Sequence, residues 1–289
     1  MRGMSSPKKP RRQYTFQVVK SVWLSPHMVR VVIGGDEFDE FADAAAERHS
    51  TDLYIKMLFA KPELGLTPPY DLDALRAELA SDDMPSQRTY TVRSIDRDAR
   101  TIAIDFVVHG DEGVAGPWAA TAAPGDWVCF SGPGGNYTPS PDADEHLFFG
   151  DDAALPAIAA AIESLHVDAR GLALIEVGSP DDEIPFAAPA GVEVRWLHRD
   201  GAPHGSVLVA AVEALAAPTA NVDVFAHGER GAMKRLRPLL HKEWGIDRSV
   251  LSLSAYWAAG RVEDAFQAEK REPIGQIFDP EPGDAARRA

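Results

Sequence analysis

The stretch Arg88-Thr-Tyr-Thr-Val-Arg93 decides the fold that this sequence predicts. It has the residue types of a β-strand, and strand-like sequence lies on both sides of it. A flavin-binding barrel needs such a strand, because Tyr90 could cover one face of an isoalloxazine ring while Thr91 hydrogen-bonds its edge. Arg88 could meet the phosphates of the same cofactor as a planar fork. The hexapeptide would equally suit ordinary sheet packing, so its meaning depends on the motifs that follow it.

The first half of the chain reads as a series of short strands bounded by turn residues. The predicted strands cover residues 14–24, 28–33, 53–59, 88–95, 101–108 and 127–131. About six strands are enough to close a small antiparallel barrel. Residues 62–84 interrupt the series, and the helical periodicity of residues 71–80 predicts a surface excursion there.

The second half alternates strands with helices, which predicts a parallel, Rossmann-like α/β sheet. The predicted strands are 146–149, 172–177, 192–196, 222–227 and 250–254, and the predicted helices are 151–165, 207–216 and 230–244. The fold class expected is therefore a six-stranded antiparallel β-barrel followed by a parallel-sheet α/β domain. The predicted segments are a basic leader (1–13), the barrel (14–141), the α/β domain with a C-terminal helix (142–272) and a flexible tail (273–289).

The charge of the chain argues against nucleic acid and anionic membranes as partners. The net charge of the 289 residues is −15, and five basic residues lie in the first 12 positions, so the remainder carries 24 basic against 44 acidic side chains. Such a body repels nucleic acid and anionic lipid. No run of about 18 apolar residues is present, so we expect a cytoplasmic protein without a membrane span. Cys129 is the only cysteine, which excludes an intramolecular disulfide and a cysteine-cluster metal site.

The loop 110–116 leads into Pro117-Trp-Ala119, which predicts a short helix with proline at an early position. Backbone N–H groups at its start could hold a pyrophosphate without any basic side chain. An ordinary Gly/Pro hairpin loop is the alternative. His109 ends the preceding strand, where it could contact a cofactor or satisfy a loop carbonyl.

Two strand ends of the α/β half carry polar candidates, because α/β folds bind ligands at the carboxyl ends of their strands. Gly150-Asp-Asp152 lacks the usual glycine fingerprint of dinucleotide sites, and Asp151 could instead cap the following helix. Gly228 permits the close approach of a ligand. Glu229 could accept hydrogen bonds from a ribose or carboxamide, or simply lie in a first helical turn.

Tyr256 and Trp257 follow another short strand, where they could stack on a ring or anchor the core. No catalytic side-chain set is found elsewhere, since the histidines lack metal-ligand spacing and there is no nucleophile elbow or Walker loop. This absence fits a reaction that a bound cofactor carries out. We therefore predict no catalytic side chain and no metal site.

In this order, the motifs resemble the siderophore-interacting protein family of FAD-dependent ferric-siderophore reductases, within the ferredoxin-reductase-like superfamily. The matching segments are Arg88–Arg93, His109-Gly110 with Gly116-Pro-Trp-Ala119, Pro124-Gly-Asp126, Gly132-Pro-Gly-Gly-Asn-Tyr137, Gly150-Asp-Asp-Ala-Ala-Leu-Pro-Ala-Ile158, Gly228-Glu229 and Tyr256-Trp257 with Gly260. Together they extend from about residue 14 to residue 271. The segment 260–264 and the C-terminal helix resemble the branch of the family with an extended C-terminus.

The resemblance implies an FAD-binding barrel and a nicotinamide-type α/β domain. Arg88, Tyr90 and Thr91 would hold the flavin, and Tyr256 and Trp257 would border its nicotinamide side. The residues implied along the ribityl-pyrophosphate chain are His109, Val114, Ala115, Gly116, Trp118 and Ala119. Where the family often has Pro-Ala-Ser, this chain has Ala115-Gly-Pro117, which gives the pyrophosphate contact to backbone N–H groups.

The implied reaction passes a hydride from NADH or NADPH to FAD and then single electrons to a ferric siderophore, which releases Fe(II) inside the cell. The acidic residues after Val177 favour NADH, Arg199 could attract the 2′-phosphate of NADPH, and ferredoxin is a third candidate donor. Arg261 and Lys270 are the predicted contacts for an anionic siderophore, among basic candidates that also include Lys56, Arg93 and Arg271. Two alternatives remain: a general flavin reductase or electron-transfer module, and a siderophore-binding carrier without catalysis.

Overall fold

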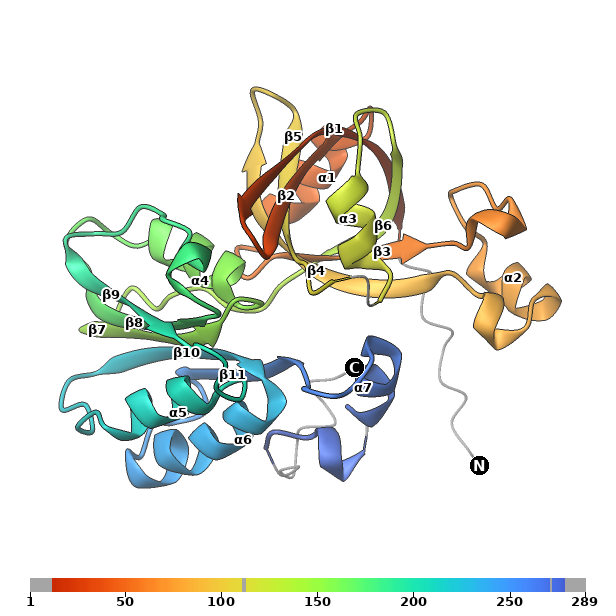
Figure 1. The fold of residues 1–289 in the computed structure, drawn as a ribbon. Helices are drawn as coiled ribbons and strands as arrows, with labels where there is room; N and C mark the ends of the chain where they lie inside the picture. Colours follow the sequence, from red (N-terminus) through yellow and green to blue (C-terminus); the bar gives the residue numbers. More distant parts are fainter. Residues whose placement is uncertain (1–11, 111–112, 271, 279–289) are drawn as a thin grey trace, which may run out of the picture.

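The structure is a computed structural model that describes residues 12–110, 113–270 and 272–278 (Figure 1). It contains a closed antiparallel barrel followed by a five-stranded parallel sheet, which confirms the predicted fold class. Most of the predicted leader and most of the predicted tail lie outside the described residues, and so does Arg271. None of the helices in the described ranges is long and apolar enough to cross a bilayer.

The barrel closes six strands in the order β1-β2-β5-β4-β3-β6. Their bounds are β1 Gln13–Ser25, β2 Met28–Gly34, β3 Tyr54–Phe59, β4 Ser86–Asp96, β5 Thr101–Val107 and β6 Trp127–Gly134. Alternate residues point inward, so apolar side chains such as Phe16, Val31 and Ile104 fill the centre. All six predicted strands form, with ends shifted by a few residues.

Helix α1 (Phe38–Ala46) packs into the barrel core and was not predicted. Its buried residues Phe38, Phe41, Ala42 and Ala45 recur at helical spacing. The ring of Phe41 packs edge-on against Phe130, with ring centroids 5.5 Å apart. The helix therefore supplies part of the barrel core.

Residues 62–84 form the predicted excursion, which Figure 1 shows projecting from the side of the barrel. It contains η1 (Pro62–Leu64), α2 (Leu72–Glu78) and η2 (Ser81–Asp83). Gln13 Nε2 donates to Tyr70 O at 2.7 Å, and Tyr70 N donates to Gln13 Oε1 at 2.8 Å. This reciprocal pair fastens the excursion to β1.

The sheet of the α/β half has the strand order β11-β10-β7-β8-β9. Its bounds are β7 Glu145–Asp151, β8 Arg170–Val177, β9 Gly191–His198, β10 Val222–Glu229 and β11 Leu251–Trp257. Helix α4 (Leu155–Glu163) covers one face, and α5 (Ser206–Glu213) and α6 (Arg230–Arg237) cover the other (Figure 1). The chain runs outward from β7 first through β8 and then through β10, so the ends of β7 and β10 form the topological switch point where such sheets bind ligands.

All three predicted helices have different bounds in the structure, and the helix predicted over 207–216 is α5, which already ends at Glu213. The helix predicted over 151–165 begins at Leu155, because Asp151 still belongs to β7. The helix predicted over 230–244 is α6 followed by the π-helical segment η4 (Pro238–Glu243), since a proline has no N–H with which to continue the α-helical ladder. Helix α7 (Glu263–Glu269) and η5 (Pro273–Gly275) follow β11.

Candidate functional site

Tyr90 lies on β4 with its ring against the barrel core. Its centroid is 4.3 Å from that of Phe106, and the side chain remains partly exposed. Burial raises the pKa of Tyr90, and the nearby Glu263 carboxylate raises it further. A neutral phenol held by the core can serve as a flat wall for a ring ligand.

Tyr256 brings the end of β11 to β4 of the barrel. Its hydroxyl lies beside the side chain of Thr91, which is buried. Burial raises the pKa of Tyr256, and the nearby Thr91 side chain opposes that rise only in part. The structure thus brings Tyr256 of the α/β half to Thr91 of the barrel, which follows Tyr90 directly in β4 and lies 165 positions before Tyr256 in the sequence.

His227 lies behind Tyr256 at the end of β10. Its ring stacks on Phe225 at 3.8 Å and meets Tyr256 edge-on at 5.0 Å. Nε2 is 2.9 Å from Ser252 Oγ, whereas Nδ1 is buried without a hydrogen-bond partner among the described residues. Burial lowers the pKa of His227 to about 3, so the ring is neutral at physiological pH. His227 Nδ1 is therefore a polar atom among the rings of Phe225 and Tyr256.

Helix α3 (Ala115–Thr121) contains most of the predicted pyrophosphate turn. The side chains of Ala115 and Ala119 are buried in the barrel core, and Trp118 packs edge-on against Phe59 at 5.5 Å. These three side chains stabilise the barrel, so a cofactor can reach mainly the backbone at their positions.

Val114 and Gly116 are the predicted turn residues that are not part of the barrel core. Val114 is 40% exposed, and a Cβ placed on Gly116 would lie 3.4 Å from Val107 O. An alanine at Gly116 would therefore be in ordinary van der Waals contact with β5. Residues 111 and 112 of the same loop lie outside the described residues.

Arg88 forms an ion pair with an acid from the far end of the chain. Its two terminal nitrogens donate to the two carboxylate oxygens of Asp264 at 2.7 and 2.9 Å, and the terminal nitrogen Nη1 also donates to Gln87 O at 2.9 Å. Asp264 lies in the first turn of α7. The phosphate contact predicted for Arg88 would therefore use a guanidinium that this carboxylate also binds.

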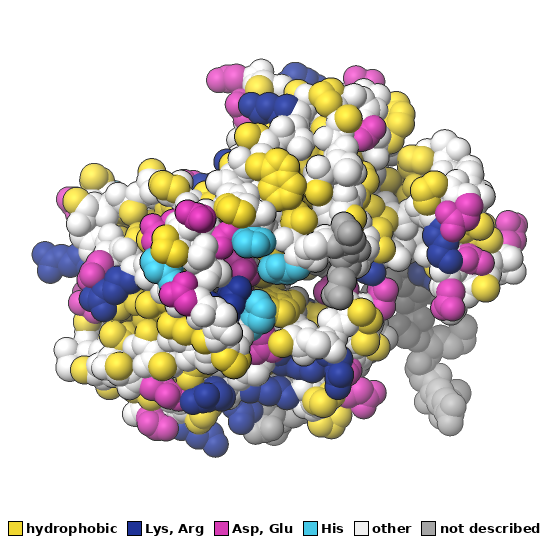
Figure 2. All heavy atoms as spheres, viewed as in Figure 1, with side chains coloured by type: hydrophobic (Ala, Val, Ile, Leu, Met, Phe, Trp, Pro, Cys, Tyr) yellow, Lys and Arg dark blue, Asp and Glu magenta, His cyan; other side chains and the backbone are white. Residues whose placement is uncertain are grey.

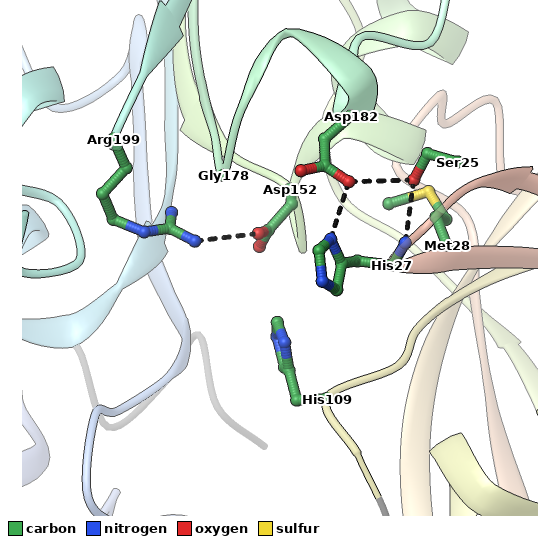
Figure 3. A pocket seen from close by; sticks show the side chains of 8 residues that line it. All are labelled: Ser25, His27, Met28, His109, Asp152, Gly178, Asp182 and Arg199. Carbon is green, nitrogen blue, oxygen red and sulfur yellow. Dashed lines mark hydrogen bonds and ion pairs between the residues drawn. The ribbon is translucent and has the colours of Figure 1, made fainter. Parts of the chain in front are cut away.

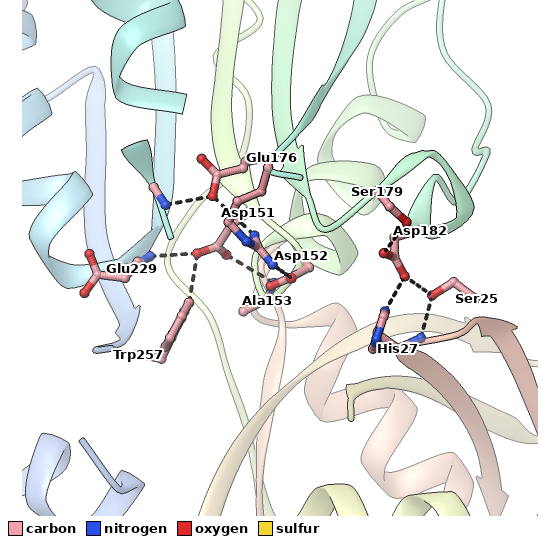
Figure 4. Close-up of polar contacts among 12 residues, drawn as sticks. Ser25, His27, Asp151, Asp152, Ala153, Glu176, Ser179, Asp182, Glu229 and Trp257 are labelled. Atoms are coloured by element: carbon pink, nitrogen blue, oxygen red, sulfur yellow. Dashed lines mark hydrogen bonds and ion pairs between the residues drawn. The ribbon is translucent and has the colours of Figure 1, made fainter. Parts of the chain in front are cut away.

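Asp151 ties three neighbouring strand ends together (Figure 4). Its Oδ1 accepts from the backbone N–H groups of Ala153 and Ala154 at 3.1 and 3.2 Å. Its Oδ2 accepts from Glu229 N and from the indole of Trp257, both at 2.8 Å. Burial raises the pKa of Asp151 to about 7, the Asp152 charge adds to the rise, and the bonds from Trp257, Glu229 and Ala154 oppose it. Since a carboxylate has about four lone-pair positions, Asp151 caps and positions this loop and has no acceptor left for the cofactor contact predicted for it.

Gly228 and Glu229 complete this junction. A Cβ on Gly228, whose φ is +153°, would lie 2.7 Å from Asp151 Oδ2, so only glycine allows the strand to pass the carboxylate. Glu229 caps α6 by accepting from Ala232 N at 2.9 Å, and its other oxygen accepts from Ala259 N at 3.2 Å. Glu229 thus caps α6, and because each of its oxygens accepts only one of these bonds, the predicted ribose contact stays a prediction.

A polar cleft lies between the two halves. Figure 2 shows histidine side chains gathering in the hollow between the barrel and the sheet. A cavity of about 80 Å³ there is lined by Ser25, His27, Met28, His109, Asp152, Gly178, Asp182 and Arg199 (Figure 3). Within the described part of the chain, no group of three or more His, Cys, Asp or Glu residues could hold a metal ion.

His27 and Asp182 join the two halves across this cleft. His27 Nδ1 is 2.8 Å from Asp182 Oδ1, which links the β1–β2 turn to η3 (Pro180–Asp182). Burial raises the pKa of Asp182, but hydrogen bonds from His27 and Ser179 outweigh it and lower the pKa overall. His109, predicted to contact the flavin chain, lies in this cleft with its ring 6.5 Å from His27 and 6.4 Å from His204.

Arg199 is neutralised by acids in the same cleft. Its Nη1 donates to Glu176 Oε1 at 3.3 Å, and Nη2 is 3.9 Å from Asp152 Oδ2. Glu176 is fully buried and also accepts from the backbone N–H groups of Gly205 and Leu208 at 2.7 and 2.9 Å. Arg199 therefore serves as the counter-ion that a buried carboxylate requires.

The two predicted siderophore contacts lie in different surroundings. Burial lowers the pKa of Lys270, Glu263 opposes this shift, and the like charge of Lys56 on β3 adds to it. Arg261 is paired instead with Glu269, Nε to Oε1 at 2.9 Å. Lys270 thus lies near the barrel cation Lys56, whereas Arg261 forms an ion pair with Glu269.

Three comparisons with known proteins bear on this arrangement. Residues 17–137 match the siderophore-interacting FAD-binding domain, and residues 143–260 match the siderophore-interacting protein family. An uncharacterized protein of Mycobacterium tuberculosis is 45% identical over 91% of this chain and 96% of its own. The ferric vibriobactin reductase of Vibrio cholerae is 29% identical over 90% of this chain and 94% of its own.

Solved structures agree with these sequence matches. A siderophore utilization protein from T. fusca superimposes with a TM-score of 0.74 at 37% identity, covering 88% of this chain and 95% of its own. The ferredoxin reductase of a carbazole dioxygenase system has a TM-score of 0.59 at 17% identity and covers 86% of this chain and 71% of its own. At that identity the likeness is one of fold alone, and it is the ferredoxin-reductase-like fold.

Proposed function

This chain belongs to the siderophore-interacting protein family, and on that premise we propose that it reduces Fe(III) held by a siderophore, with electrons from a nicotinamide dinucleotide delivered by way of FAD. The observation that carries the proposal is the position of Tyr256, at the end of sheet strand β11, beside Thr91, the neighbour of Tyr90 in barrel strand β4. A ring site bounded by a barrel wall on one side and a parallel-sheet strand end on the other is what a hydride-accepting flavin requires. The reductase name of the Vibrio cholerae relative supports the same reaction.

The residues at this junction fit FAD. Tyr90 offers an aromatic face, Thr91 a hydroxyl, and Arg88 a planar guanidinium suited to phosphate. The buried Nδ1 of His227, which has no partner among the described residues, offers a polar contact beside Tyr256. When bound, FAD would accept a hydride and pass electrons singly to iron. The tasks left to the protein are to hold the ring, to exclude water from one face and to bind the chelate at the exposed edge.

No acid–base residue is required for the release of iron. Fe(III) is a hard, highly charged ion that oxygen donors hold tightly, whereas Fe(II) is held far less well. Reduction alone therefore weakens the chelate. This agrees with a site whose titratable groups, such as Glu229 and Asp151, already serve as caps.

We propose NADH as the donor. Arg199 already neutralises buried Glu176, so the cation considered for the 2′-phosphate of NADPH is occupied. The neighbouring residues Asp181 and Glu183 are acidic and would repel a 2′-phosphate. A lower KM for NADPH than for NADH in steady-state kinetics would contradict this choice.

We propose that the siderophore lies between Lys270, which directly follows α7, and Lys56 of β3. Many ferric siderophores are anionic, and the chain as a whole carries a net charge of −15, so local cations must attract the substrate. The lowered pKa of Lys270 reflects, besides burial, the repulsion of Lys56, which a bound anion would relieve. Arg261 would not contact the siderophore directly, because its guanidinium is paired with Glu269, the residue before Lys270.

An anaerobic titration tests the function directly. The protein is loaded with FAD, reduced with NADH, and mixed with a ferric siderophore and a ferrous trap. Bleaching on NADH addition, followed by reoxidation and trapped Fe(II), is the expected result. A protein that binds ferric siderophore without taking up FAD would be a carrier. Equal rates with artificial acceptors and no saturation by siderophore would make it a general flavin reductase.

A further inference from the structure

Helix α7 bridges the two halves of the molecule. Its last turn is held to the α/β half, where Glu269 pairs with Arg230 at 2.5 Å and with Arg261 at 2.9 Å. Phe266, 1% exposed, packs against Ala255 and Ala258 of the same half. Its first turn reaches the barrel strand β4, and Figure 1 shows α7 beneath that side of the barrel.

The contact with the barrel is the ion pair between Asp264 and Arg88. The side chain of Arg88 is only 12% exposed, whereas that of Asp264 is 69% exposed. The arginine is therefore fixed in the barrel wall and the acid approaches it from the solvent side. The packing of Phe266 and Glu269 holds α7 to the sheet independently of this pair.

Carboxylate and phosphate bind a guanidinium in the same way, because each presents two oxygens to two parallel N–H donors. Asp264 uses both terminal nitrogens of Arg88. A phosphate approaching the same fork would meet an occupied donor pair and a negative charge beside it.

We propose that Asp264 is a positioning residue that sets the affinity of this protein for FAD, by competing with the flavin phosphates for the guanidinium of Arg88. The inference rests on the FAD-binding role proposed for Arg88. FAD binding then releases the first turn of α7 from the barrel. Since Lys270 directly follows α7, this helix links the flavin site to the proposed siderophore site.

The test compares the dissociation constant for FAD of the wild-type apoprotein with those of Asp264→Asn and Glu263→Gln, measured by quenching of flavin fluorescence. Glu263 is the matched control, because it carries the same charge one residue earlier and does not bond Arg88. Asp264→Asn should tighten FAD binding by about three- to tenfold, as expected for the loss of one well-aligned ion pair, and Glu263→Gln by clearly less.

A double-mutant cycle with Arg88→Gln separates competition from general charge effects. Arg88→Gln should weaken FAD binding, and adding Asp264→Asn to it should change nothing further. Unchanged or weaker FAD binding by Asp264→Asn alone would overturn the proposal, and so would equal effects of the two acid variants. A wild-type protein that binds no FAD would instead contradict the proposed function. Circular dichroism checks that the variants fold.

Discussion

The indole N–H of Trp257 donates to Asp151 Oδ2 at 2.8 Å, and the backbone N–H of Glu229 donates to the same oxygen at the same distance. These are the last residues of β11, β7 and β10, which lie side by side in the sheet. One buried carboxylate oxygen therefore holds three strand ends in register. Tyr256, one residue before Trp257, is held in the position from which it meets the barrel.

Asp151→Asn should destabilise the protein by about 2–3 kcal/mol, because the new amide NH₂ would face N–H donors and leave buried groups unpaired. Urea unfolding monitored by circular dichroism would measure the change in the free energy of unfolding. Asp168→Asn is the control, since the side chain of Asp168 is 88% exposed. A loss no larger than that of the control would mean that the junction at Asp151 is not needed for stability.

Tyr90→Leu should raise the dissociation constant for FAD by about tenfold, because an aliphatic side chain offers the flavin ring no aromatic face. Tyr90→Phe keeps the ring and should bind FAD almost as the wild type does. Fluorescence titration of the apoproteins measures both constants. If the two variants lost affinity equally, the hydroxyl and not the ring of Tyr90 would be the important group.

Lys270 should give the reaction an alkaline limit. Because burial lowers its pKa, its ammonium group loses the proton at a lower pH than an ordinary lysine does. The KM for an anionic ferric siderophore should therefore rise as the pH rises towards that lowered pKa. Lys270→Arg should not show this rise, since a guanidinium stays protonated throughout. A rise of the same size with a neutral quinone acceptor would show that Lys270 is not its cause.

The pair of His27 and Asp182 should stabilise the protein in a pH-dependent manner. The folded-state pKa of Asp182 is lowered, so its contribution is complete above the unfolded-state pKa of about 3.9 and is lost as the pH falls through the folded-state value. The difference in unfolding free energy between wild type and Asp182→Asn should be largest near pH 7 and shrink at acid pH. A difference independent of pH would exclude the carboxylate charge as its source.

Local sequence patterns predicted much of the fold because periodicity reflects which face of an element is buried. The alternation of apolar and polar residues predicted the strands β1 to β6 of the barrel. The alternation of strands and helices after residue 145 predicted the parallel sheet. Helix α1 was missed although Phe38 and Phe41 recur at helical spacing. At the site, Thr91 and Tyr256 were chosen from local motifs and lie side by side, whereas local sequence did not show that Asp151 and Glu229 bind backbone N–H donors.

Other residues of the site left no local signal. Asp264 is one of 44 acidic residues, and only the return of α7 to β4 distinguishes it. His27 lies in a turn that predicts nothing beyond the turn itself, yet it meets Asp182 from 155 positions away. Pairings over such separations depend on how the two halves pack, which no short window of sequence contains.

The sequence by itself determined the order of elements, the two-domain architecture and the family, because each depends on residue types at short, regular spacing. Only the tertiary structure decided which charged groups are free to meet a ligand. Arg88, Arg199 and Arg261 look alike in the sequence, but each is paired with a different acid in the folded chain. The reason is physical: a charge taken out of water must find a partner, and its partner is whatever residue the fold brings within reach.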